Sequence, residues 1–220
     1  MRLLPLCIIA ALATPAWGDP APPGDTGDTI SAVQRRTLRQ AKRVEILPYA
    51  SMSIGDPYLQ RWGAGLRAMW HVREGLSFGL DLSGMGTWAT EDLVIAKREL
   101  HARIIDSRQR AALAAMASIA PLYGKVALPG DALVQFETFF DAGLGGALTE
   151  TDTTRGVRPL ITAGIGQRVF LNQNFALTAR VGGNLYAERV RVNDGLMTKA
   201  MGFWSFALGL SVYFPGGGDQ

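Results

Sequence analysis

Hydrophobic and polar residues alternate along most of the chain after residue 43. In the stretch 203–214, one set of alternate residues carries large apolar side chains and the other set carries mostly small ones. The apolar set consists of Trp204, Phe206, Leu208, Leu210, Val212 and Phe214. Because successive side chains of a β-strand point to opposite faces, this stretch is predicted to be a strand with one strongly apolar face.

The same two-residue period recurs and predicts an all-β fold of about eight antiparallel strands, each of roughly 10 to 12 residues, which suits a tilted bilayer crossing. Clear strands are expected at 43–54, 61–72, 75–88, 133–148, 159–171, 175–187 and 203–214, and a weaker one near 111–122. Helix formers in 91–116 predict a long loop with some helix before the weaker strand.

The connections between these strands differ in length on alternate sides. Mostly short turns are expected at 71–76, 121–132 and 171–174, and longer polar loops at 89–110, 149–156 and 188–201. Outer-membrane barrels have short periplasmic turns and longer outer loops. The chain is therefore predicted to form an eight-stranded antiparallel transmembrane β-barrel with up-and-down topology.

The polar faces of the strands indicate what the apolar faces meet. They carry many Gly, Ser and Thr residues, with scattered charges of both signs: Glu45, Arg67, Asp81, Glu137, Asp141, Arg168 and Arg180. A soluble surface would favour Lys, Glu and long polar side chains, whereas a narrow eight-stranded lumen is filled by side chains whose charges must pair. The pattern favours lipid outside and a charge network inside. A soluble β-sandwich or lipocalin-like barrel is the alternative.

The N-terminal residues 1–18 have the pattern of a secretory signal peptide. Arg2 precedes an apolar run, Leu3–Ala13, and Ala16 and Gly18 are the small residues expected before a cleavage site. A membrane anchor is the alternative. Residues 19–42 are expected to be a periplasmic linker, 43–215 the barrel and 216–220 a C-terminal tail.

Composition and charge narrow the function. The 220 residues carry a net charge of +3 that is spread along the chain, so no nucleic-acid partner is expected. The one cysteine, Cys7, lies in the signal peptide, and His71 and His101 are the two histidines, so neither a metal nor another cofactor is expected. His101 near Asp106 and Ser107 is a weak hydrolase candidate, and the protein is not expected to be an enzyme.

Several segments together resemble the outer-membrane β-barrel domain family of myxobacteria and related proteobacteria, and more generally OmpA-type small barrels. They are "VQRR", "VEILPYASMSIGDPY", "PLYGK", "GIGQRVFLNQNFALTARVGGNLY" and "LGLSVYF", within Val33–Phe214. The resemblance implies a small barrel in the bacterial outer membrane, with some members in envelope complexes that include gliding-motility machinery. The end of the chain, with Gly209, Val212 and Phe214, also resembles the signal read by outer-membrane assembly machinery.

The expected function is that of a structural anchor or partner-binding component of a cell-envelope complex, with its N-terminus in the periplasm. The expected partners are outer-membrane lipid, the assembly machinery and envelope proteins. Contacts with envelope proteins are expected through the outer loops 89–110 and 188–201 or the basic segment Val33–Arg43. The alternative is a small channel, in which the inward charges would line a polar path.

Overall fold

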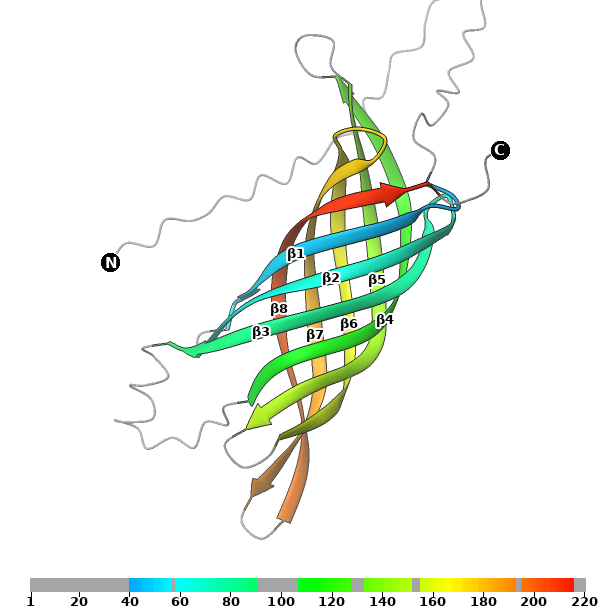
Figure 1. Ribbon diagram of the computed structural model, residues 1–220. Helices are drawn as coiled ribbons and strands as arrows, with labels where there is room; N and C mark the ends of the chain where they lie inside the picture. The colour runs from blue at the N-terminus through cyan, green and yellow to red at the C-terminus, as the bar shows by residue number, and fades with distance from the viewer. Residues whose placement is uncertain are drawn as a thin grey trace, which may run out of the picture. The chain divides into compact units, whose positions relative to one another are not determined.

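The computed structural model of the chain describes residues 40–56, 58–90, 107–127, 133–151, 155–192 and 195–215 (Figure 1). The regular elements of this part are β-strands: β1 (Val44–Ile54), β2 (Leu59–Arg73), β3 (Leu76–Ala89), β4 (Ser107–Ala127), β5 (Leu133–Thr151), β6 (Arg155–Phe170), β7 (Phe175–Val192) and β8 (Gly195–Phe214). Within these residues, no helix is long and apolar enough to span a membrane.

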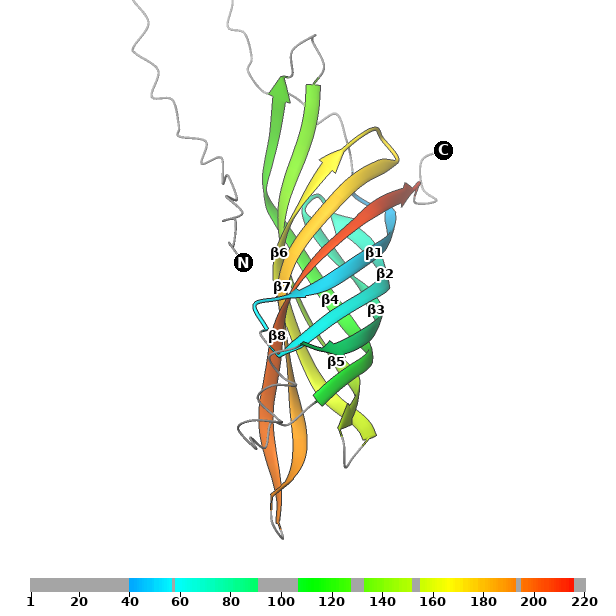
Figure 2. The same ribbon diagram turned by 90° about the vertical axis from the view of Figure 1, so that its left-hand side faces the viewer.

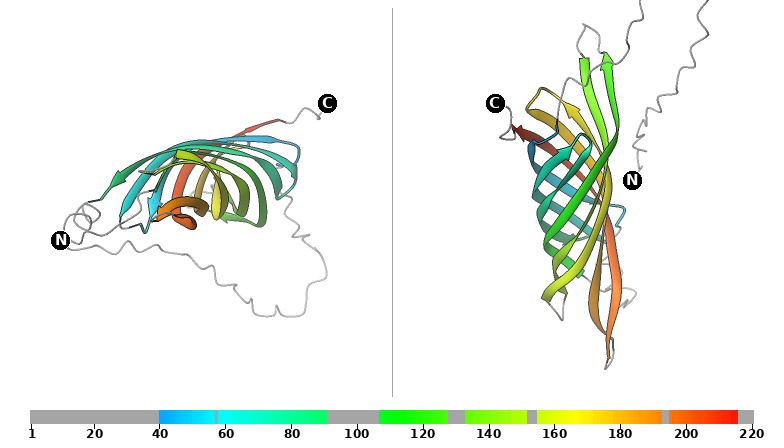
Figure 3. Two further views of the ribbon diagram at one scale, coloured as in Figure 1. Left: turned by 90° about the horizontal axis from the view of Figure 1, so that it is seen from below. Right: turned by 90° about the vertical axis from the view of Figure 1, so that its right-hand side faces the viewer.

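The strands form a closed barrel. Each strand pairs antiparallel with the next one along the chain, and β8 returns to pair with β1, where Val44 faces Phe214 and Ile54 faces Trp204. The strands are inclined to the long direction of the barrel, as the right-hand view of Figure 3 shows. The predicted fold class, an eight-stranded antiparallel up-and-down β-barrel, is confirmed for the described residues.

The two faces of each strand have opposite surroundings. Leu80 and Leu208 are 55 % and 46 % exposed on the outside of the barrel, whereas their neighbours Asp81 and Ala207 are 9 % and 8 % exposed and point into the lumen. Alternation along a strand places successive residues on opposite sides of the wall. The interior of the barrel is therefore its polar side.

Several strands are longer than the sequence predicted. Residues 121–127, predicted as a turn, complete β4, and most of 188–201, predicted as a loop, forms the ends of β7 and β8. The β4–β5 and β7–β8 hairpins project from opposite ends of the barrel (Figures 1 and 2). The prediction was wrong because ladder pairing, as in Tyr123 with Glu137 and Glu188 with Lys199, needs no apolar face.

The region predicted as a loop with some helix is partly strand. Residues 107–116 belong to β4, where Ala112, Ala114 and Met116 point inward and Leu113 points outward. Alanine on both faces hides the two-residue period, and irregularities near Gln109 and Ile119 interrupt it. The predicted signal peptide, residues 19–39 of the predicted linker, His101 and the predicted tail 216–220 lie outside the described residues.

Candidate functional site

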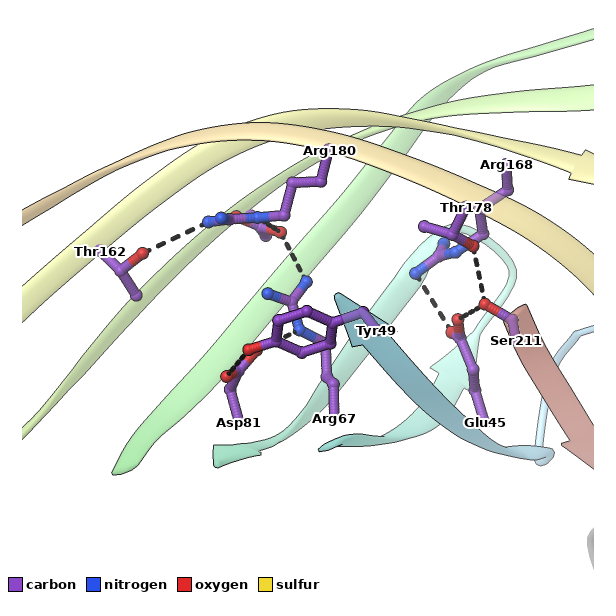
Figure 4. A network of polar contacts seen from close by, with 10 residues as sticks. Glu45, Tyr49, Arg67, Asp81, Thr162, Arg168, Thr178, Arg180 and Ser211 are labelled. Atoms are coloured by element: carbon purple, nitrogen blue, oxygen red, sulfur yellow. Dashed lines mark hydrogen bonds and ion pairs between the residues drawn. The ribbon is translucent and has the colours of Figure 1, made fainter. Parts of the chain in front are cut away.

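All seven charged residues predicted to face the lumen are buried inside the barrel, each at most 9 % exposed. They are Glu45, Arg67, Asp81, Glu137, Asp141, Arg168 and Arg180. The structure gathers them into two networks, one in the middle of the lumen and one near the end that holds the β2–β3 and β6–β7 turns. Figure 4 shows labelled members of both.

The central network joins two arginines and two aspartates. The Nε and Nη2 atoms of Arg180 donate to the two carboxylate oxygens of Asp141, each at 2.7 Å. Arg67 donates to Asp141 at 2.8 Å and to Asp81 at 2.6 Å, and the hydroxyl of Tyr49 also donates to Asp81 at 2.6 Å. These side chains come from β1, β2, β3, β5 and β7, so the network crosses the lumen (Figure 4). It is electrically neutral when all four ionisable groups are charged.

The end network is centred on Glu45. Its carboxylate lies 3.1 Å from Nη2 of Arg168 and 2.9 Å from Nε2 of His71, and accepts a hydrogen bond of 2.6 Å from Ser211. Arg168 also lies 3.6 Å from the carboxylate of Glu137. One guanidinium therefore bridges carboxylates of β1 and β5, and ties non-neighbouring strands together.

Gln40 closes the same end of the barrel. Its side chain is 2 % exposed and donates to Glu137 at 2.6 Å, while its backbone N–H donates to Glu74 at 3.0 Å. The residues just before β1 are thus held against the β2–β3 turn and the lumen. Sequence reasoning missed Gln40 because it lies outside any alternating pattern, in a segment predicted as linker.

His71 belongs to the lumen network. His71 follows Arg67 by four residues, so the two-residue alternation puts both on the same polar face, and that was the available signal for a lumen residue. Its Nδ1, Nε of Arg168 and the hydroxyl of Tyr213 are buried without a hydrogen-bond partner among the described residues. Buried polar groups of this kind ordinarily bind water. We therefore expect ordered water at this end of the lumen.

The other half of the lumen contains an apolar cluster beside buried polar residues. Leu160, Tyr186 and Phe203 pack together there, and the guanidinium of Arg61 lies 4.5 Å from the centre of the Phe203 ring. Between this cluster and the central network is a cavity of about 40 Å³, lined in part by Tyr49 and Arg180. A cavity of this size holds a few water molecules. Side chains fill the lumen on both sides of it.

Asp56 organises the β1–β2 turn at this end. Its carboxylate accepts hydrogen bonds from the backbone N–H groups of Tyr58 and Leu59 and pairs with Arg61 at 2.6 Å. Partial burial raises the pKa of the carboxyl, but the bonds from Arg61 and the two amides outweigh burial, so the pKa lies below its ordinary value. Asp56 is therefore held as a carboxylate.

Exposed aromatic residues of β2, β3 and β8 include two groups in paired register positions, separated along the strands. At one end Trp70 is in register with Val44 and Phe78, and Val44 is in register with Phe214. At the other end Trp62 pairs with Met52, and Trp204 with Ile54. Trp62 and Trp70 are eight positions apart on β2, which is about 27 Å along the strand and about 20 Å along an axis tilted by about 40°.

The row predicted to face lipid on the last strand lies on the outside of the wall. Trp204, Leu208, Leu210 and Phe214 are exposed, and Phe206 and Val212 are partly covered by neighbouring side chains. The alternate residues of β8, on the opposite face of the strand, point into the lumen and include Ser205, Ala207 and Ser211. The geometry thus separates an apolar exterior from a polar, ion-paired interior.

No family model matches the chain, and no curated protein matches its sequence. Solved structures with similar folds include the N-terminal β-barrel domain of Pseudomonas aeruginosa OprF, with 11 % identity, a TM-score of 0.44, and coverage of 79 % of this chain and 98 % of that one. Neisserial surface protein A has 13 % identity, a TM-score of 0.45, and coverage of 78 % and 96 %. Outer membrane protein OprG of P. aeruginosa has 9 % identity, a TM-score of 0.45, and coverage of 80 % and 98 %.

Proposed function

We propose that the protein is an outer-membrane barrel that serves as a structural anchor or partner-binding component of a cell-envelope complex. The observation that carries the proposal is the inverted polarity of the barrel. Large apolar side chains such as Leu144 and Trp204 are 65 % and 62 % exposed, whereas Glu45 and Arg168 are 0 % and 2 % exposed inside. Water would penalise that apolar exterior, and lipid would not.

The closed ladder supports the membrane part of the proposal. Each described strand has partners on both sides, so the strand segments within the wall leave no open edge. A bilayer tolerates strands only in such a closed arrangement, because backbone N–H and C=O groups find no water there. The separation of Trp62 and Trp70 along the barrel axis, about 20 Å, also fits within the apolar band of outer-membrane barrels, which is about 25 Å tall.

The filled lumen supports an anchor over a channel. Two ion-pair networks cross it, and Gln40 occupies one end. Eight strands enclose a space that side chains can fill completely. We propose that the networks stiffen the wall. The small channel remains the alternative function, favoured by the cavity beside Arg180.

Partners would contact the barrel through its projecting parts. The β7–β8 hairpin extends from the end that we assign to the outside, and Gln40 of the proposed linker lies at the opposite end, which we assign to the periplasm. The basic segment Val33–Arg43 and the outer region 89–110 are further proposed contact regions, described here only at 40–43, 89–90 and 107–110. Gliding-motility machinery is the proposed kind of complex, on the family resemblance alone.

The test begins with the membrane. The full chain is expected to remain in the outer-membrane fraction after a carbonate wash, and to migrate differently on an SDS gel before and after boiling. Chemical crosslinking in cells, followed by purification under detergent, would then identify envelope partners. A carbonate-soluble protein without a heat shift would contradict the membrane assignment. A folded membrane barrel that crosslinks to no envelope protein would contradict the anchor role.

A further inference from the structure

An exposed cluster of arginines lies on the outside of the barrel at the ends of β4, β5 and β6. These three strand ends lie side by side in Figure 1. Glu150 of β5 is in register with Arg108 of β4 on one side and with Arg155 of β6 on the other. Arg110 donates to the same carboxylate at 2.8 Å. These three arginines and Glu150 are called the arginine rim, and their own formal charges sum to +2.

The arginine rim differs from the ion pairs of the lumen. The side chains of Arg110 and Glu150 are 43 % and 41 % exposed, and Arg155 is also exposed. Arg110 lies at the irregularity between Gln109 and Ala111, which breaks the two-residue period and places an extra charge on the outside. Exposed ion pairs contribute little to stability, so stiffening the wall does not account for the cluster.

The apolar exterior begins next to the arginine rim, on the side toward the middle of the barrel. Val157 follows Arg155 by two residues and is 72 % exposed, and Leu148 precedes Glu150 by two residues. Residues two apart on a strand share a face and lie about 7 Å apart. Leu113 and Leu144 continue the same apolar surface toward the middle of the barrel. The positive charges therefore lie at the level where lipid headgroups would meet the barrel.

We propose that the arginine rim binds the phosphate of a lipid headgroup in the leaflet at this end of the barrel. The inference rests on the proposed membrane location. A guanidinium donates two parallel hydrogen bonds to phosphate oxygens, which suits arginine better than lysine to this role. The acyl chains of the same lipid would lie against Val157 and Leu144. Contact with both surfaces favours a lipid over free phosphate.

The opposite rim offers an internal control. Arg73 is an exposed residue at the other end of β2, where the described residues place no comparable group of arginines around it. Arg43, at the same end, donates to the backbone carbonyl of Gln173 and the side chain of Asn174. Replacing Arg73 removes one positive charge from the protein without touching the arginine rim.

The experiment titrates fluorescent diphosphoryl lipid A into the full chain in neutral detergent micelles. The double variant Arg110→Gln/Arg155→Gln is expected to bind about 25-fold more weakly, from about fivefold for each basic side chain near a charged lipid surface. Arg73→Gln is expected to bind like the unchanged protein. Glu150→Gln is expected to bind about fivefold more tightly, because it removes the competing carboxylate. Damage to the fold cannot produce that gain.

Three results would overturn the inference: equal binding by the double variant, equal binding of dephosphorylated lipid A, or displacement of the lipid by inorganic phosphate at matched concentration. The last would assign the site to free phosphate. Each sample is also tested for the heat shift on a gel. Loss of the shift in the unchanged protein would refute the membrane location and the lipid site together. A barrel that shows the heat shift but binds lipid A equally well with and without its phosphates would refute the lipid site alone.

Discussion

At the residue scale, Asp141 is the shared acceptor of the central network. It receives two hydrogen-bonded arginines, Arg67 and Arg180, from strands on either side of the lumen. Arg67 also donates to a second carboxylate, that of Asp81. Both of the short bonds of Arg180, in contrast, go to Asp141. Loss of the Asp141 charge therefore leaves a buried guanidinium without its counter-ion.

Asp141→Asn is expected to destabilise the barrel by about 3–5 kcal/mol, the usual cost of breaking a buried ion pair from one side. Urea unfolding of the protein in lipid vesicles, followed by tryptophan fluorescence, measures the change. Glu150→Gln is the matched control, because it breaks an exposed pair with Arg110 and should cost less than about 1 kcal/mol. Equal losses for the two variants would show that burial does not set the value of these pairs.

The sequence predicted which charged residues face the lumen, but it did not predict which of them form ion pairs with each other. Two-residue alternation placed all seven charged side chains on the lumen face, and Arg67 with Asp81 is a direct cross-strand pair. The bond from Arg67 to Asp141 joins residues 74 positions apart, and depends on how the closed sheet is sheared. That shear leaves no trace in the local pattern. The sequence could therefore predict a network but not which partners it joins.

At the element scale, the ends of the strands were harder to predict than their middles. The middle of each strand faces an apolar environment outside and a filled lumen inside. Apolar and polar residues therefore alternate strictly there. Beyond that zone, pairs such as Arg158 with Glu188 at 3.0 Å continue the interior with polar groups, and the alternation fades while the ladder persists. β4 was poorly marked for a different reason, since Ala112 and Ala115 lie on opposite faces and look alike.

The β1–β2 turn is an element whose stability should depend on pH. The pKa of Asp56 is lower in the folded turn than its ordinary value of 3.8, so the turn is stabilised at any pH above that ordinary value. The stabilisation is expected to be lost as the pH falls through the lower, folded pKa, where the carboxylate gains a proton. The backbone amide shifts of Tyr58 and Leu59, followed by NMR in micelles, report the change.

Asp56→Asn is the control for that titration. Its amide oxygen can still accept from the two backbone N–H groups, but the ion pair with Arg61 is gone. The amide shifts of Tyr58 and Leu59 should then be independent of pH over the acid range. An Asp56 midpoint at or above 3.8 in the unchanged protein would contradict the role given to Arg61 and the two amides.

At the scale of the whole molecule, the two networks and the apolar exterior constrain each other. A wall that faces lipid has to turn its polar side inward, and an interior of eight strands is too narrow to keep charges apart. The charges are therefore paired with one another, as Glu45 is with Arg168 and Asp141 is with Arg180. The same pairing that compensates the buried charges also obstructs the lumen, so we expect a stable barrel of this kind not to conduct ions.

Conductance separates the anchor from the channel. In planar bilayers the unchanged protein is expected to show no steady ion current, because guanidinium–carboxylate pairs cross the lumen at two levels. Arg180→Ala should remain closed, since Arg67 still joins Asp81 to Asp141 and the Glu45 network is untouched. Only combined loss of Arg67, Arg168 and Arg180, which removes the pairs at both levels, should open a path. A steady current in the unchanged protein that Arg180→Ala alters would instead assign the lumen to transport, with the central network as its gate.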